Sequence, residues 1–97
     1  MKASWDSELD AFCDALWLEE GLSPHTLESY RRDLAQLARW LSSHDQTLMT
    51  AGAGELQRFL GERGLKQGIA ARSIARQLSA LKRYYRWLNR QGLRADD

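Results

Sequence analysis

The stretch that decides the fold is RSIARQLSALKRYYRWLNR, residues 72–90. Its apolar side chains recur at steps of four, three, four and three, at Ile74, Leu78, Leu81, Tyr85 and Leu88. Because an α-helix turns once in about 3.6 residues, this spacing places all five on one side of a helix. The pattern predicts a helix over residues 72–90 that ends near Gly92 and turns this apolar row toward a core.

The opposite side of this predicted helix carries a row of arginines. Six positions line up there: Arg72, Arg76, Ser79, Arg83, Arg86 and Arg90. Ser73 and Lys82 flank the row, and Gln77 lies a little further round. The predicted helix contains no acidic residue, so the charges repel one another unless an outside anion neutralises them. Arginine donates paired hydrogen bonds to phosphate or to the O6/N7 edge of guanine, and a helix fits the DNA major groove.

Two further long helices are predicted upstream. Residues 5–20 have one apolar face, and Gly21 follows where a left-handed C-terminal cap is needed. Residues 23–42 open with Ser23 as a side-chain cap and Pro24 at the first helical position. The apolar face of residues 5–20 consists of Trp5, Leu9, Phe12, Cys13 and Leu16. The inward face of residues 23–42 consists of Leu27, Tyr30, Leu34, Leu37, Ala38 and Leu41.

A shorter third helix is predicted around Leu56, Phe59 and Leu60, with Thr50 as a candidate cap. We expect three glycines to mark its end and the loop that follows: Gly61, Gly64 and Gly68. The sequence contains no strand-like alternation and no internal repeat. Its 97 residues are therefore predicted to form one all-α domain of four helices.

The formal net charge of +1 conceals a strong separation of charge along the chain. Residues 1–22 contain six acidic residues and one lysine, whereas residues 63–95 contain nine basic residues and no acidic one. Solvated helix faces usually mix both signs. The separation therefore predicts that a polyanion binds the basic part of the domain.

The predicted helix over residues 23–42 repeats the basic pattern more weakly. Opposite its apolar face lie His25, Ser29, Arg32, Gln36 and Arg39, with Glu28 at the edge. Thr26 and the free amides of the first turn are placed to meet a phosphate, because a helix N-terminus attracts anions. If any residue reads a base, we favour Arg76 or Gln77. The predicted DNA-binding residues are His25, Thr26, Ser29, Arg32, Arg39, Arg72, Ser73, Arg76, Gln77, Ser79, Arg83 and Arg86.

Other function classes find no support in the residues. No His or Cys cluster has metal-ligand spacing, no nucleophile lies at a set spacing from a base, and no cofactor motif occurs. Tyr84 and Tyr85 are interpreted as packing residues, and a single cysteine, Cys13, forms no internal disulfide. The acidic N-terminus is not a signal peptide and no apolar run has bilayer length, so we expect no membrane partner and a cytoplasmic location.

Two readings of the arginine row stay open beside duplex DNA binding. A helical interaction module can dock an acidic protein partner through the same row, and the row can also be merely a solvated face. RNA binding is favoured less, because the exposed faces lack the aromatic side chains on which unpaired bases stack. Competition with generic duplex DNA distinguishes DNA binding from docking of a protein partner.

The order of several short motifs resembles the tyrosine recombinases of the XerD/XerC type, in the phage-integrase family. In the first half these are residues 14–19 (DALWLE), Leu22, residues 26–27 (TL) and residues 30–34 (YRRDL). In the second half, residues 79–85 (SALKRYY), residues 87–88 (WL), Arg90 and residues 94–97 (RADD) are similar to the family. The likeness covers nearly the whole chain. One departure is Ala71-Arg72, where the family often has a Ser or Thr cap.

The resemblance implies that residues 1–92 are an N-terminal core-binding domain, a small, all-α, SAM-like orthogonal bundle of four to five helices. Residues 93–97 are expected to begin a linker to a catalytic domain that is absent here. In the family this bundle is one half of a C-shaped clamp, with its second and fourth helices on duplex DNA. The arginine and histidine residues and the tyrosine nucleophile belong to the other half, so the 97 residues are expected not to be an enzyme.

For the full-length parent, the resemblance implies a site-specific tyrosine recombinase that resolves chromosome dimers. Its expected roles are therefore DNA recombination and integration, chromosome partition and cell division. Two recombinase types would each bind one half of a short, nearly palindromic site, so partner recombinase subunits are expected for the whole protein. The isolated domain is expected to be a monomer without a cofactor.

Overall fold

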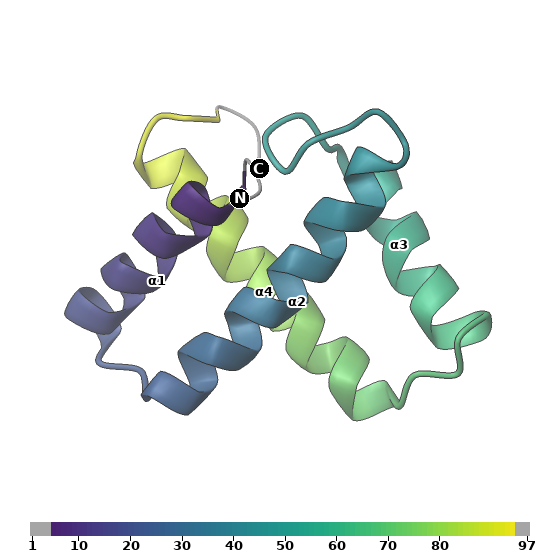
Figure 1. The fold of residues 1–97 in the computed structure, drawn as a ribbon, viewed down its shortest axis with the longest axis horizontal. Coiled ribbons are helices and arrows are strands. Elements are labelled where there is room, and N and C mark those ends of the chain that lie inside the picture. Colours follow the sequence, from purple (N-terminus) through teal and green to yellow (C-terminus); the bar gives the residue numbers. More distant parts are fainter. Residues whose placement is uncertain (1–4, 95–97) are drawn as a thin grey trace.

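The structure, a computed structural model, describes residues 5–94 and contains four helices (Figure 1). They are α1 (Asp6–Glu20), α2 (Pro24–Ser42), α3 (Ala53–Leu65) and α4 (Ala71–Arg90). No strand occurs in these residues, so the predicted all-α class is confirmed. None of the four helices combines the length and the apolar character that crossing a bilayer requires.

Local signals set the ends of the first two helices as predicted. Gly21 has a φ of 62° and its N–H donates to the carbonyl of Trp17, which closes α1 with a left-handed cap. Ser23 precedes α2 in an extended conformation, and its Oγ accepts a hydrogen bond from the Thr26 N–H at 3.2 Å. Pro24 occupies the first position of α2, where a missing N–H removes no helical hydrogen bond.

The prediction for α3 was wrong at both ends. The residue before α3 is Gly52, whose N–H donates to the Glu55 carboxylate at 3.2 Å, while Thr50 closes a separate turn with Thr47. The helix continues through Gly61 and Gly64 to Leu65. A glycine inside a helix costs about 1 kcal/mol relative to alanine, and the packing of α3 on the bundle offsets that loss.

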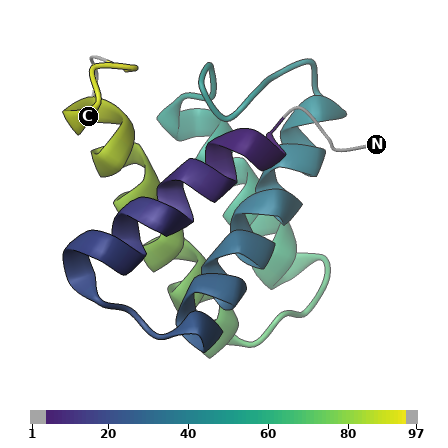
Figure 2. The ribbon, with the colours of Figure 1, turned by 60° about the vertical axis from the view of Figure 1, so that its left-hand side comes forward.

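α2 and α4 cross at the centre of the molecule, α1 packs on α2, and α3 contacts both α4 and α2 (Figures 1 and 2). The N-terminal ends of α2 and α4 lie on the same side of the bundle in both views, and the two helices diverge from the crossing in both directions (Figure 1). This arrangement decides which side chains of the two helices can act together.

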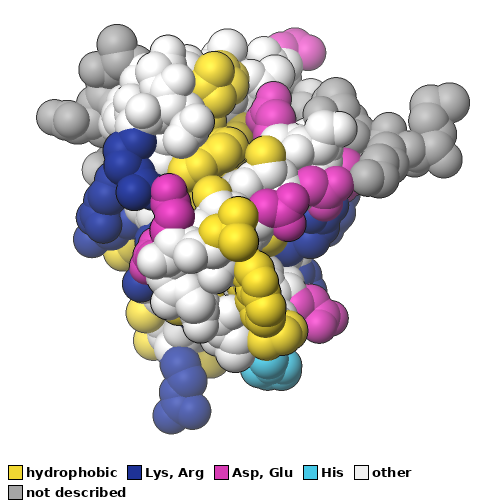
Figure 3. Space-filling view, turned by 90° about the vertical axis from the view of Figure 1, so that its left-hand side faces the viewer, with side chains coloured by type: hydrophobic (Ala, Val, Ile, Leu, Met, Phe, Trp, Pro, Cys, Tyr) yellow, Lys and Arg dark blue, Asp and Glu magenta, His cyan; other side chains and the backbone are white. Residues whose placement is uncertain are grey.

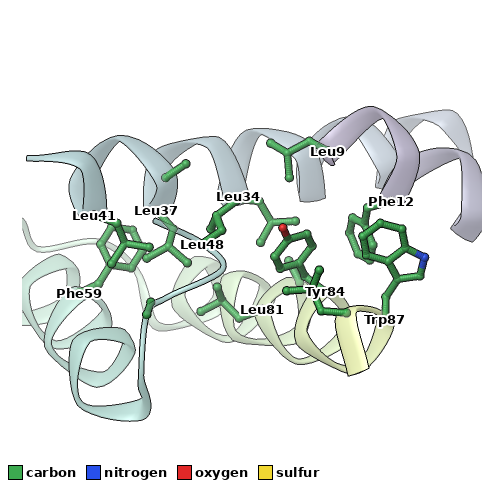
Figure 4. Close-up of a cluster of buried hydrophobic side chains, with 14 of the residues drawn as sticks. Leu9, Phe12, Leu34, Leu37, Leu41, Leu48, Phe59, Leu81, Tyr84 and Trp87 are labelled. Atoms are coloured by element: carbon green, nitrogen blue, oxygen red, sulfur yellow. The ribbon is translucent and has the colours of Figure 1, made fainter. Parts of the chain in front are cut away.

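The core fills the space around this crossing (Figure 4). Phe12 of α1 meets Tyr84 of α4 edge to face, with ring centroids 5.2 Å apart, and Trp87 lies 5.7 Å from the same ring. The buried side chains of α2 and α3 in this cluster include Leu34, Leu37, Leu41 and Phe59. Aromatic side chains of this size each bury a large apolar area, which gives a short chain a continuous core.

The buried face of α4 differs from the predicted one. Its buried residues are Gln77, Ala80, Leu81, Tyr84, Trp87 and Leu88. Leu81 and Leu88 were placed correctly, but Leu78 is 38% exposed, and Ile74 and Tyr85 are only partly covered. The face is rotated toward Tyr84 because α1 and α2 together cover that side of α4. The interpretation of Tyr84 and Tyr85 as packing residues is confirmed.

Tyr84 keeps its only polar atom satisfied inside the core. Its hydroxyl donates to the carboxylate of Glu8 at 3.1 Å, which ties α4 to α1. Burial, and then the nearby negative charge of Glu8, raise the pKa of Tyr84 far above its usual value near 10. The phenol therefore stays protonated wherever the domain is folded.

The end of the described chain is attached to the bundle. Leu93 donates through its N–H to the carbonyl of Leu88 at 3.0 Å. The guanidinium of Arg94 donates to the carbonyls of Leu48 and Met49 and lies 4.8 Å from the ring centre of Tyr85. The remaining positions of the predicted linker, residues 95–97, lie outside the described residues.

Candidate nucleic-acid interface

The arginine row of α4 divides into paired and unpaired side chains. Arg72 and Arg86 are exposed and, within residues 5–94, have no acidic partner. Lys82, which flanks the row, is exposed and unpaired in the same sense. Ser79 is exposed and Ser73 is half-buried. These residues lie on the outer side of α4, as the helical spacing predicted.

Arg76 is held by an acid of the neighbouring helix. Its Nε and Nη2 donate to the two carboxylate oxygens of Asp33 at 2.8 and 2.9 Å. The Asp33 side chain is 2% exposed, whereas that of Arg76 is 40% exposed. The hydrogen bonds that Arg76 donates to Asp33 raise the pKa of Arg76, so its charge is permanent. This bidentate pair lies where α2 crosses α4 and fixes one edge of the guanidinium.

Gln77 does not lie on the outer face. It is 1% exposed, and its Nε2 donates to the backbone carbonyl of Asp33 at 3.0 Å. The predicted position beside the arginine row is wrong, because the buried face of α4 is rotated by about one residue toward it. In this place the side chain joins α4 to α2 at their crossing.

The C-terminal half of α4 lies beside the C-terminal end of α1, which is acidic. Arg83 forms an ion pair with Glu20, and Arg90 pairs with Glu19 at 3.4 Å. Figure 3 shows the side of the molecule that carries α1, where acidic side chains lie directly beside Lys and Arg. The expectation that the row lacks acids inside the domain was therefore wrong for Arg76, Arg83 and Arg90. It holds for Arg72 and Arg86 within the described part of the chain.

The outer face of α2 carries the second set of predicted residues. His25, Arg32 and Arg39 are exposed, and neither arginine has an acidic partner among the residues that the structure describes. Ser29 is half-buried. Thr26 belongs to the cap of α2, since its hydroxyl accepts from Ser23 at 3.0 Å and keeps its own proton to donate.

The predicted DNA-binding residues of α2 and α4 lie in two groups, one on each side of the crossing of the two helices. The first turns of α2 and α4 lie on one side of the bundle, which brings His25 and Thr26 to the same side as Arg72 and Ser73 (Figure 1). Arg39, Arg83 and Arg86 belong to the later halves of the two helices, on the other side of the crossing. α4 also begins without a side-chain cap at Ala70, which leaves first-turn amides available to an anion. The departure seen at Ala71-Arg72 thus corresponds to an uncapped helix.

Two acids that the sequence reasoning missed, Asp33 and Glu20, decide which arginines are paired. A signal for Asp33 was present, because it falls within the apolar face of α2, one turn from Tyr30 and Leu37. A buried carboxylate needs a partner that neutralises it. No comparable signal marked Glu20, since its partner lies 63 positions away in the sequence.

The described residues offer nothing for catalysis on a metal. Residues 5–94 contain no group of three or more His, Cys, Asp or Glu side chains arranged to hold an ion. Cys13 is half-buried as a free thiol, and its burial raises the pKa of that thiol.

Comparison with known proteins identifies the class. Residues 9–92 match the family described as phage integrase, N-terminal SAM-like domain, and the chain therefore belongs to this family. Among its relatives, the tyrosine recombinase XerD of Haemophilus influenzae is 46% identical over 89 residues, which are 92% of this chain and 30% of that protein. The resemblance that the motifs indicated is confirmed.

Other relatives agree. The tyrosine recombinase XerD of Yersinia pestis is 45% identical over 97 residues, covering 100% of this chain and 32% of that protein. The tyrosine recombinase XerD of Pseudomonas putida is 47% identical over 89 residues, covering 92% of this chain and 30% of that protein. The chain thus spans about a third of the length of these relatives. No solved structure matches it significantly.

Proposed function

We propose that this domain binds duplex DNA through the outer faces of α2 and α4. The observation that carries the proposal is a set of five cations on these two helices without an acidic partner in the described residues. They are Arg32, Arg39, Arg72, Lys82 and Arg86. Cations without partners on a single pair of crossing helices favour a polyanionic ligand.

The proposed contacts are mainly with phosphates. His25, Thr26, Arg72 and Ser73 contact the backbone at the side where α2 and α4 begin, and Ser29 and Ser79 add hydroxyl donors. Arg32, Arg39, Arg83 and Arg86 extend the contacts along both helices. Arg76 is the residue that we assign to a base: Asp33 fixes its Nε edge and leaves the Nη1/Nη2 edge for a guanine. Gln77 is left out because it is buried.

For the full-length protein we propose the role of a site-specific tyrosine recombinase. The family and the XerD relatives support this, and the chain spans about a third of the length of those relatives. In that proposal the domain is half of a clamp around DNA in the cytoplasm. A linker near residues 93–97 joins it to the catalytic half, and other recombinase subunits complete the assembly.

The experiment is a titration of a labelled duplex of about 30 base pairs, followed by fluorescence anisotropy at several salt concentrations. The Arg72→Ala/Arg86→Ala variant removes two unpaired cations from α4. If both contact phosphates, binding weakens and the slope of log K against log salt becomes shallower by about two. The matched control is Arg58→Ala/Lys66→Ala, which removes a cation of α3 and the cation directly after it, both of which pair with Glu62.

The result that contradicts the proposal is a control variant that loses as much affinity as the α4 variant. Absence of binding at low salt by the folded parent contradicts it equally. Circular dichroism of each variant shows whether the helical fold is retained, which separates a lost contact from a lost fold.

One observation favours a second candidate, the docking of an acidic protein helix. A hollow of about 450 Å³ lies between α3 and α4, with Leu56, Leu60 and Leu78 among the side chains that line it. Lys82 and Arg86 also line it. An amphipathic helix with acidic flanks suits such a surface. Under this reading, generic duplex DNA does not compete with the partner; under the first, it does.

A further inference from the structure

A second hollow lies on the outer side of α4, where the end of α1 approaches it. Its volume is about 430 Å³. Its lining consists of Ser79, Lys82, Arg83, Arg86, Arg90 and Glu20. Four of these six side chains are cations, Ser79 adds a hydroxyl, and Glu20 supplies the single negative charge among them.

The ion pair of Glu20 with Arg83 is open to solvent. The two side chains are 36% and 34% exposed, and the neighbouring pair of Arg90 with Glu19 is more exposed still. Exposed pairs of this kind hold together weakly, because water and salt screen the charges. Both Lys82 and Arg86 in the same hollow have no acidic partner in residues 5–94, so the local potential stays positive.

The position of Glu20 is unfavourable for α1 itself. It is the last residue of the helix, where the backbone carbonyls already concentrate negative charge. No basic residue occurs in the last turn of α1 to compensate. The carboxylate is therefore stabilised from outside its own helix, by Arg83, whose pKa is raised mainly by the hydrogen bond to Glu20.

We propose that this hollow is a phosphate subsite and that the carboxylate of Glu20 is its resting counter-ion, which a DNA phosphate displaces. The inference rests on the proposed DNA binding and adds how one part of that surface is regulated. A carboxylate and a phosphate present similar pairs of oxygens to a guanidinium, so one can replace the other on Arg83. Ser79 and Arg86 then contact the same phosphate or its neighbour.

Displacement has a measurable consequence. Glu20 competes with the phosphate for Arg83, so that the phosphate binds only when the Glu20–Arg83 ion pair breaks. Removing the charge of Glu20 therefore tightens binding while the number of phosphates contacted stays the same. The affinity rises but the slope of log K against log salt does not change, which distinguishes displacement from an arginine that Glu20 blocks permanently.

The test compares Glu20→Gln with Asp14→Asn in the 97-residue chain. Asp14 is an exposed acid of the same helix, and its substitution removes the same charge away from the hollow. We expect Glu20→Gln to tighten binding of the 30-base-pair duplex about fivefold at 50 mM salt, and Asp14→Asn to change it less than twofold. In an Arg83→Ala background the effect of Glu20→Gln is expected to vanish, because its partner is gone.

The outcomes separate the two proposals. Tightening that is no larger for Glu20→Gln than for Asp14→Asn, or that persists in the Arg83→Ala background, overturns the displacement and leaves DNA binding standing. A salt slope that steepens by about one in Glu20→Gln overturns it too, because the arginine was then blocked in the parent. Absence of duplex binding by every variant, with helical circular dichroism intact, overturns the proposed function and the subsite together.

Discussion

Two arginine–carboxylate pairs on α4 have the same chemistry and opposite consequences. At the crossing with α2, Arg76 donates two hydrogen bonds to Asp33, whose side chain is almost wholly buried. At the outer edge, Arg83 pairs with Glu20, and both side chains remain solvated. Burial of the acid decides the difference: the inner carboxylate cannot give up its arginine, whereas the outer one can.

The largest expected effect in this comparison is on stability at the crossing. Arg76→Ala leaves the buried carboxylate of Asp33 without its counter-charge, which we expect to lower the free energy of unfolding by about 3 kcal/mol. Urea denaturation followed by circular dichroism measures it. Arg72→Ala, an exposed arginine of the same helix without an acidic partner in residues 5–94, is the control and is expected to change stability by less than about 0.5 kcal/mol.

Equal free energies of unfolding for Arg76→Ala and Arg72→Ala would contradict the difference between the inner and outer pairs. Asp33 would then gain enough solvent or a new partner to tolerate the loss of Arg76, and the inner pair would be no different from the outer one. Arg76 would also be freed from its positioning role, and its assignment to a base would lose its structural reason.

The buried face of α4 shows which features of the fold can be predicted from local sequence and which cannot. Two overlapping rows fit the helical spacing of residues 72–90, one through Leu78 and Tyr85 and the other through Tyr84 and Trp87. Leu81 and Leu88 belong to both rows. The choice between them depends on which helices cover α4, and local spacing does not contain that information. The end of α1 and the start of α2 were predictable because a glycine, a serine and a proline act within one turn.

The candidate binding surface could be predicted only in part, because local spacing does not show which side chains of other helices contact α4. Reading α4 alone correctly placed Arg72, Arg83 and Arg86 on its outer side. It missed that Arg76 has an acid 43 positions upstream and Arg83 one 63 positions upstream. Such partners depend on how the helices cross. For Arg76 and Arg83, the acidic partner belongs to another helix and not to α4 itself.

Tyr84 makes a further buried contact of α4, because its hydroxyl donates to the half-buried carboxylate of Glu8. The tyrosine hydroxyl of an unfolded chain ionises near pH 10, whereas the raised pKa of Tyr84 keeps it protonated in the fold. Stability that is complete below pH 10 is therefore expected to fall as pH rises above it, since only the unfolded state releases this proton. Thermal unfolding at pH 8 to 11 measures the change.

Tyr84→Phe serves as the control for this pH dependence. It removes the hydrogen bond to Glu8 at a cost of about 1 kcal/mol at neutral pH, and it is expected to reduce the loss of stability above pH 10. An unchanged alkaline loss in the variant assigns that loss to other groups. Tyr85→Phe, at a partly covered ring whose hydroxyl donates to Leu48, is the matched comparison.

The smallest expected effect is the coupling between Glu20 and Arg83, and it decides how the outer edge works. A double-mutant cycle of unfolding free energies with Glu20→Gln and Arg83→Ala is expected to give a coupling of about 0.9 kcal/mol at low salt, which corresponds to the fivefold change in binding, and near zero at 1 M, where screening extends over only about 3 Å. The cycle of Asp33→Ala with Arg76→Ala is expected to keep its larger coupling at both salts, because its carboxylate is buried. A Glu20–Arg83 coupling above about 1.5 kcal/mol, or one that salt leaves unchanged, means a carboxylate that a phosphate does not displace. The outer pair would then be a structural contact like the inner one, and the difference between the two regions would disappear.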